Sequence, residues 1–310
     1  MVNISASNFT IIGDKTSTSP ITGTSLDTSE LILYIIVATT NCVSCPFTVL
    51  LNISVIIAIK RRPTLQTNAN FILACLAVTD ALTGLVAQPF CAVYSILRAL
   101  NVDNRTSFLG FRFAMSILVP SSLLHLVMVV FERLVAIKFP FRYPYVVKTR
   151  NIKFVVLFSW VYGIVYGMVL QLGDNTTTLH FLWLSHLPVL TFVFIFFSYV
   201  TLYFETRRHQ RNIKTQQLPQ GEVERFLKDN RALKTTVYVV GSISLCLVPV
   251  GIYSVFRGFG IHLVVETYRE MIRTFLMLNS FLNPLIYCWR QRELRRYLLR
   301  CSFQGVNPFN

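Results

Sequence analysis

Long apolar stretches alternate with shorter polar segments along the whole chain. Each stretch is long enough to cross a membrane, because about 20 helical residues span roughly 30 Å of hydrocarbon. Seven such stretches cover residues 31–59, 69–97, 108–131, 153–172, 180–204, 233–256 and 271–289. The pattern predicts an all-α membrane protein, a seven-transmembrane helix bundle.

Composition agrees with this interpretation and excludes a soluble globule. Of the 310 residues, 53% are hydrophobic and only 14% are charged, too few to cover a globular surface. The formal net charge of +15 would suggest nucleic-acid binding if it formed one face of a soluble fold. We instead assign it to membrane topology and to contact with anionic membrane lipids, and expect no nucleic-acid partner.

The charges are distributed unequally between alternate segments. In the segments after the first, third, fifth and seventh stretches, Lys and Arg exceed Asp and Glu by 16, whereas the other segments have an excess of one acid. The positive-inside rule then places the amino terminus outside the cell and the carboxyl terminus in the cytoplasm. Glycosylation triplets of the form Asn-x-Ser/Thr agree with this orientation. Four of them lie in predicted outer segments and start at Asn3, Asn8, Asn104 and Asn175, and one more lies within the first stretch.

The two ends of the chain differ in character. Residues 1–30 are rich in Ser and Thr and predict a disordered, glycosylated extracellular tail before the seven-transmembrane domain of residues 31–289. Residues 290–301 place Leu and Tyr on one face and arginines around it, which predicts a short amphipathic eighth helix in the membrane interface. Cys301 at its end is a candidate for palmitoylation, and residues 302–310 form a cytoplasmic tail.

Asp80 is the only acidic residue deep within the seven stretches. A lone buried carboxylate is costly, so it should be neutral, paired or bound to a cation. Candidate oxygen ligands are Ser122 in the third stretch and Asn279, Ser280 and Asn283 in the seventh. This set suits a hard monovalent ion better than a transition metal, and a plain polar network is the alternative.

The third stretch ends in a charge pair, Glu132 and Arg133, within the text FERLVAIKFPFRY. The seventh stretch ends in Asn283-Pro284-Leu285-Ile286-Tyr287 and leads into the basic amphipathic segment. These features resemble the DRY and NPxxY motifs of rhodopsin-like (class A) G-protein-coupled receptors. The fifth-stretch ending, Asp229 and NPLIY are similar to adenosine receptors, whereas the missing outer bridge and short second external loop are similar to melanocortin receptors.

The chain departs from the family pattern at several positions. Glu132 replaces the Asp of the DRY motif and Leu134 its Tyr, while the sixth stretch carries Leu247 where the family has the tryptophan of CWxP. The fifth stretch has Thr191 near the position of the usual proline. No cysteine stands near Phe108, so the usual bridge to the second external loop is missing.

The resemblance implies a plasma-membrane receptor for an extracellular small-molecule or peptide ligand, acting on a heterotrimeric G protein. It implies a sixth helix that bends at Pro249 and an Arg133 latch. Asp229, at the cytoplasmic end of the sixth stretch, either pairs with Arg133 at rest or is a solvated charge. Tyr199 and Tyr287 are expected to take part in the switch, and Pro140 and Phe141 to pack against the G protein. The positions around Asp80 match an allosteric sodium pocket in this family.

The ligand is not identified by the sequence. The resemblance places Met115 where amine receptors have an aspartate and Met277 where opsins have the retinal lysine, so we expect neither ligand. Met115, Met277, Leu247 and Arg112 are candidate pocket residues. Arg112 either extends to the headgroups or faces the cavity mouth. Basic residues near the outer rim suggest an anionic or amphipathic ligand, namely Arg98, Arg112, Arg257 and His262.

Two other classes of function remain to be weighed. A transporter or channel is the alternative, although such proteins usually carry several intramembrane charges or broken helices in repeated halves. An intramembrane enzyme is not indicated, because the sequence has neither an HExxH motif nor paired intramembrane aspartates.

Overall fold

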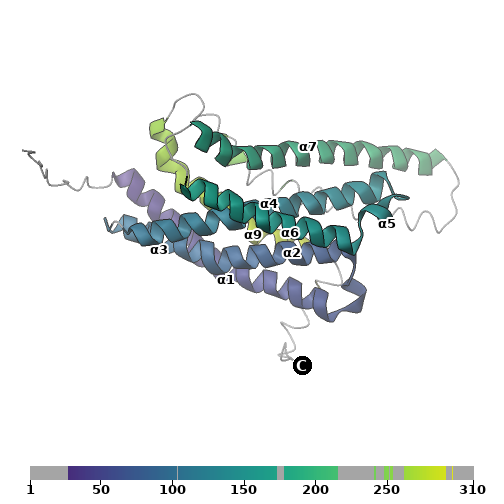
Figure 1. Ribbon diagram of the computed structural model, residues 1–310, viewed down its shortest axis with the longest axis horizontal. Coiled ribbons are helices and arrows are strands. Elements are labelled where there is room, and N and C mark those ends of the chain that lie inside the picture. The colour runs from purple at the N-terminus through teal and green to yellow at the C-terminus, as the bar shows by residue number, and fades with distance from the viewer. Residues whose placement is uncertain are drawn as a thin grey trace, which may run out of the picture.

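The computed structural model describes residues 27–102, 104–172, 178–215, 241, 248–250, 252–253, 262–290 and 295. Throughout this part of the chain the regular structure is helical, and the long helices run side by side along the long axis of the molecule (Figure 1). The predicted all-α fold class is therefore confirmed.

The helices follow the apolar stretches of the sequence. Their bounds are α1 Thr28–Arg61, α2 Asn68–Leu82, α3 Gln88–Ala99, α4 Arg105–Lys138, α5 Tyr143–Val146, α6 Thr149–Leu172, α7 Thr178–Thr215 and α9 His262–Arg290. A short 3-10 turn, Pro63–Leu65, precedes α2, and a π-helical turn, Thr83–Ala87, joins α2 to α3 in one continuous rod. The stretch predicted over 233–256 lies mostly outside the described residues.

Five rods in the described part of the chain are long and apolar enough to cross a membrane. They are α1, the joined α2 and α3, α4, α6 and α7. The central one is α4, because 72% of its most apolar window is buried, against 28% for α6. It packs against α2, α3, α6 and α7, and so is the common neighbour of these four helices.

Polar residues at the helix ends explain where the helices begin. The Asn104 side chain accepts the backbone N–H of Ser107 at 3.0 Å, which caps α4. Thr67 caps α2 in the same way, through the N–H of Asn70 at 3.2 Å.

The carboxyl-terminal end of α4, at Lys138, lies beyond the predicted limit of residue 131, because the polar residues after residue 131 still form backbone helix bonds. Glu132 therefore lies within the helix and not at its end.

Close packing of α6 on α4 depends on a glycine. A Cβ atom added to Gly163 would lie 2.8 Å from the backbone oxygen of Ile117, closer than such atoms approach. Small residues allow neighbouring membrane helices to come together in this way. The contact fixes α6 against the middle of α4, one turn from Ser121 and Ser122.

The buried side chains form two apolar clusters. One includes Leu76 and Leu126 and lies toward the helix ends that are predicted to be cytoplasmic, so we name it the cytoplasmic apolar cluster. The other includes Val37, Phe111 and Met277 and lies toward the opposite helix ends, which are predicted to be outer, so we name it the outer apolar cluster. Asp80 falls between the two clusters, so the polar layer around it separates an outer core from an inner one.

Candidate functional site

Asp80 joins three helices through its carboxylate. Its Oδ1 accepts hydrogen bonds from Ser122 Oγ of α4 and Ser280 Oγ of α9, each at 2.8 Å. Its Oδ2 accepts from Asn283 Nδ2 at 2.9 Å, and the Asp80 side chain has no exposed surface. The structure thus brings together four of the five residues selected from the sequence, from segments up to 203 positions apart.

The fifth residue, Asn279, borders a small cavity beside the carboxylate. The cavity holds about 10 Å³, room for about one water molecule or a bare cation, and Ser122 and Ser280 also line it. The side-chain oxygens of Asn279 and Asn283 are buried without a hydrogen-bond partner among the described residues. A set of oxygens around one carboxylate fits a sodium ion.

A transition metal is a poorer fit at this position. The described residues contain no group of three or more His, Cys, Asp and Glu side chains that could hold one. Such metals prefer imidazole or thiolate ligands, and the side chains that surround Asp80 offer neither. The residues that would hold sodium are Asp80, Ser122, Asn279, Ser280 and Asn283.

Pro284 explains why α1 is attached to the same layer. Proline has no backbone N–H, so the carbonyl of Ser280, four residues earlier, loses its helical partner. Asn52 Nδ2 of α1 donates to this carbonyl at 3.0 Å and to the Thr48 carbonyl at 2.8 Å. The bond between Asn52 and the carbonyl that Pro284 leaves free therefore attaches α1 to α9, which Asp80 already joins to α2 and α4.

A second polar group lies near the carboxyl-terminal end of α4. Arg133 Nε lies 3.2 Å from Glu132 Oε2, and the Tyr143 hydroxyl donates to Glu132 Oε1 at 2.7 Å. Burial, together with the neighbouring Glu132 carboxylate, raises the pKa of Tyr143 above its ordinary value, so the phenol keeps its proton. Glu132 is 3% exposed, and its bond to Tyr143 ties the following loop to the helix.

Tyr143 is not among the residues predicted from the sequence. Its side chain reaches Glu132 only because residues 139–146 turn back on the end of α4, with the Tyr143 N–H bonded to the Phe139 carbonyl at 3.0 Å. Pro140 and Phe141 of the same loop are exposed, Phe141 to 92%. Tyr199 of α7 is partly buried against the cytoplasmic apolar cluster.

Several predicted residues cannot be placed in this geometry. Asp229, the expected partner of Arg133, lies outside the described residues, as do Leu247, Cys301, Asn3, Asn8 and Asn175. Tyr287 belongs to α9, but its side chain is outside the described part. Pro249 lies in a short described helical piece and is half-buried. Asn104 uses its Oδ1 to cap α4.

The candidate pocket residues pack within the outer half of the bundle. Met277 is fully buried in the outer apolar cluster, and Met115 is partly buried against it. Arg112 donates a short hydrogen bond to the Leu170 carbonyl of α6, a contact that neither expected orientation included. As ligand contacts these residues remain predictions.

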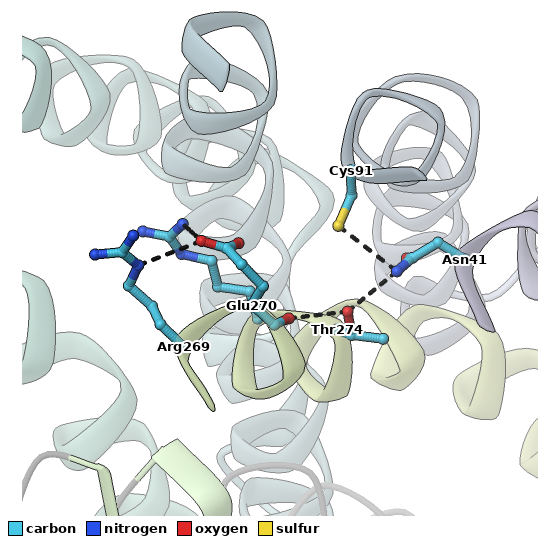
Figure 2. Close-up of polar contacts among 6 residues, drawn as sticks. Asn41, Cys91, Arg269, Glu270 and Thr274 are labelled. Carbon is cyan, nitrogen blue, oxygen red and sulfur yellow. Dashed lines mark hydrogen bonds and ion pairs between the residues drawn. The ribbon is translucent and has the colours of Figure 1, made fainter. Parts of the chain in front are cut away.

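Glu270 is a buried acidic residue that was not predicted from the sequence. It is 4% exposed, and its Oε1 lies 2.7 Å from Arg273 Nη1 and 3.3 Å from Arg269 Nε (Figure 2). The expected seventh stretch began at residue 271, whereas α9 begins at His262. The spacing of Glu270 and Arg273, three residues apart, was the available signal for a longer helix.

The same turn of α9 connects to α1 and α3. Thr274 Oγ1 donates to the Glu270 carbonyl at 3.0 Å and accepts from Asn41 Nδ2 at 3.1 Å. Asn41 Nδ2 also lies 3.6 Å from Cys91 Sγ, and Figure 2 shows these side chains converging from three helices. The outer end of the bundle thus has its own polar network, distinct from the one around Asp80.

We expect Glu270→Ala to lower the stability of the folded protein by about 2 kcal/mol. Breaking a buried ion pair costs more, but the two arginine side chains are 33% and 23% exposed, so solvent screens part of the loss. Glu270→Gln keeps an oxygen acceptor and should cost about half as much. Thermal unfolding of the purified protein measures both, and no difference between alanine and wild type would contradict a structural role.

Comparison with known proteins gives one family. The model of the 7 transmembrane receptor (rhodopsin family) matches residues 51–181 and 173–287. The trace amine-associated receptor 13c of Danio rerio is 28% identical over 302 residues, covering 86% of this chain and 84% of that receptor. The adenosine receptor A2a of Canis lupus familiaris is 26% identical, covering 79% of this chain and 66% of that receptor. The histamine H2 receptor of Cavia porcellus is 24% identical, covering 79% of this chain and 73% of that receptor.

Proposed function

Because the chain belongs to the rhodopsin family of seven-transmembrane receptors, and so is a G-protein-coupled receptor, we propose that its ligand acts from outside the cell through the Asp80 layer. The family membership disfavours the transporter or channel alternative. The proposal includes a plasma-membrane location, an extracellular amino terminus and an allosteric sodium ion at Asp80.

The observation that carries this proposal is the set of three hydrogen bonds to Asp80. They join α2, α4 and α9 midway between the outer polar network and the Glu132–Arg133 pair. From Ser122 to Arg133, α4 is one unbroken helix of about 16 Å at 1.5 Å per residue. A change in the bonds to Asp80 is therefore transmitted by a rigid element to the cytoplasmic end.

A ligand drives this change only through a difference in its affinity for the two states of the bundle. We propose that release of Ser122 or Asn283 from Asp80 accompanies the active state, in which Arg133 leaves Glu132. The G protein would then contact Arg133 together with the exposed Pro140 and Phe141.

We propose further that the ligand carries an anionic or amphipathic group and no essential amine. Two relatives are named for trace amines and histamine, but Met115 stands at the position where the resemblance places the amine-binding aspartate. Arg112 lies close enough to Arg269 and Arg273, near the outer ends of the helices, for their positive charges to repel each other. This group of cations supports an anionic group on the ligand.

The test is nucleotide exchange by purified heterotrimeric G proteins in vesicles that contain the receptor. One representative of each Gα class is measured with a ligand library split into anionic, neutral and amine compounds, and vesicles without receptor are the control. We expect exchange above control with at least one class, and stimulation by an anionic compound. Exchange at the control level for every class, together with solute flux, would contradict the proposal. An epitope tag on the amino terminus should be reachable on intact cells.

A further inference from the structure

Arginine side chains from three helices gather around Glu270, at the helix ends that are predicted to be outer. Glu270 is 4% exposed, and its Oε1 accepts one N–H from Arg273 and one from Arg269 of the same helix, α9. Arg112 of α4 lies close enough to both of these arginines for the charges to interact. We name the set the outer arginine group, and its members are Arg98, Arg112, Arg269 and Arg273.

The fourth member, Arg98, comes from α3. It belongs to the group because the hydroxyl of Tyr94, one turn earlier in α3, interacts electrostatically with both Arg98 and Arg269. The same hydroxyl also interacts with the Glu270 carboxylate. Three helices that are distant in sequence therefore direct guanidinium groups to one region.

Positive charge exceeds negative charge among the described side chains of this region. They carry four guanidinium groups against the one carboxylate of Glu270, and all four arginines are half-buried, so water screens their repulsion only in part. Each guanidinium has five N–H donors in a fixed fork, and a single carboxylate oxygen cannot use them all. An anion with several charges and several oxygens would lower the repulsion and accept further hydrogen bonds.

The Glu270 carboxylate occupies two of the arginines in the way that the anion of a ligand would. Only its Oε1 takes part, at 2.7 Å from Arg273 and 3.3 Å from Arg269. Its Oε2 is buried without a hydrogen-bond partner among the described residues, and a buried acceptor left in this state costs free energy. Glu270 is thus an internal counter-ion that an anion with more oxygens can displace.

Aromatic rings lie directly beside the arginines. The Tyr94 ring stacks on Phe111 with centroids 6.2 Å apart, and Phe108 lies 5.4 Å from Tyr94. The Arg273 guanidinium lies 5.7 Å above the Phe111 ring. Such rings offer apolar surface next to the cations, so the region suits an anion that is attached to an apolar or aromatic body.

We propose that the outer arginine group binds the phosphate of an organic phosphate monoester, whose apolar body packs beside Phe108. A phosphate monoester carries about −1.5 to −2 charges near pH 7 and three acceptor oxygens, which suit several arginine forks better than a carboxylate does. A water-soluble aromatic phosphate and a single-chain lipid phosphate share this chemistry. The assignment rests on the anionic ligand proposed above, and it names the charged group of that ligand.

Helix α9 connects this site to the Asp80 layer. Ser280, which donates to Asp80, lies about 15 Å after Glu270 along the same helix at 1.5 Å per residue. Thr274 lies between them and bonds to both the Glu270 carbonyl and the Asn41 side chain of α1. A phosphate that releases the Glu270 carboxylate from its arginines would therefore act on a helix that ends in the hydrogen bonds to Asp80.

The test measures the binding of small phosphates to the full chain in nanodiscs, without G protein. Phenyl phosphate represents the aromatic source and hexyl phosphate the single-chain lipid source. Phenyl sulfate and hexyl sulfate are the matched compounds with a single charge. Isothermal titration calorimetry gives the dissociation constants, and nanodiscs without protein are the blank.

Three variants distinguish a built site from diffuse attraction. Arg112→Gln removes one guanidinium of the group but keeps an amide that can donate to the Leu170 carbonyl, the present partner of Arg112. Glu270→Gln removes the competing charge and keeps the shape of the side chain. The control is Arg105→Gln, which removes an exposed cation about 10 Å before Arg112 along α4.

We expect at least one phosphate to bind the wild type about tenfold more tightly than its sulfate counterpart, because its second charge meets further guanidinium groups. Arg112→Gln should weaken phosphate binding about tenfold and Glu270→Gln should strengthen it about fivefold, while Arg105→Gln should leave it within about twofold. The phosphate that binds more tightly identifies the source, aromatic or lipid, and either result supports the phosphate assignment.

Three results would overturn the proposal. They are equal affinity for phosphate and sulfate, an equal loss in Arg112→Gln and Arg105→Gln, and weaker binding by Glu270→Gln. Phosphate binding without nucleotide exchange would contradict only the proposed coupling, because the binding assay contains no G protein. Exchange stimulated by other anions, without phosphate binding, would contradict only the phosphate site.

Discussion

Replacing Arg133 with alanine is expected to reduce receptor-catalysed nucleotide exchange about thirtyfold. The guanidinium lies near the carboxyl-terminal end of α4, is 23% exposed and stands 3.2 Å from Glu132 Oε2. Truncating one partner of a hydrogen-bonded charge at an interface costs about 2–5 kcal/mol, and each 1.4 kcal/mol is a factor of ten. The measurement is exchange in vesicles with a fixed amount of properly folded receptor.

Glu132→Gln supplies a matched comparison with the opposite sign. It removes the charge that restrains Arg133 but keeps an oxygen for the Tyr143 hydroxyl, which is now 2.7 Å from Glu132 Oε1. Since a pair of this exposure is worth about 1 kcal/mol, basal exchange should rise about fivefold. Lys148 is an exposed cation after the same loop, and Lys148→Ala should change neither the basal nor the receptor-catalysed exchange. A fall in exchange for Glu132→Gln as large as for Arg133→Ala would show that the pair is not a restraint.

The parts of the site that depend on depth in the membrane could be predicted from the sequence. A carboxylate in hydrocarbon must find polar partners, and helices of known rise bring Ser122, Ser280 and Asn283 to the level of Asp80. The same reasoning assigned the helices, because an apolar run of membrane length has no other stable backbone structure.

The parts that depend on chain direction outside the membrane could not be predicted in this way. Tyr143 reaches Glu132 because the loop after α4 turns back, and no apolar pattern encodes that turn. Glu270 follows Arg269 and precedes Arg273, so its sequence neighbours suggested an outer loop. Only the extension of α9 to His262 puts its carboxylate inside the bundle.

Asp80→Ala is expected to lower the free energy of unfolding by about 3 kcal/mol. The substitution removes the acceptor for three donors, and buried donors left without partners cost about 1–3 kcal/mol each. The two serine hydroxyls can turn to carbonyls of their own helices, so most of the loss falls on the fully buried Asn283. Because unfolding of large membrane proteins is often irreversible, the half-life of the folded receptor at fixed temperature is measured beside its melting temperature.

Asp80→Asn separates the hydrogen bonds from the charge. The amide keeps one oxygen for Ser122 and Ser280 and should lose less stability than alanine, but it removes the charge that would hold sodium. In wild type, sodium chloride should stabilise relative to choline chloride of equal ionic strength, by about 1 kcal/mol at five times the dissociation constant. The asparagine variant should show no such difference. A sodium effect of equal size in both proteins would move the ion away from Asp80, since the oxygens of Asn279 and Asn283 alone carry no charge to attract it.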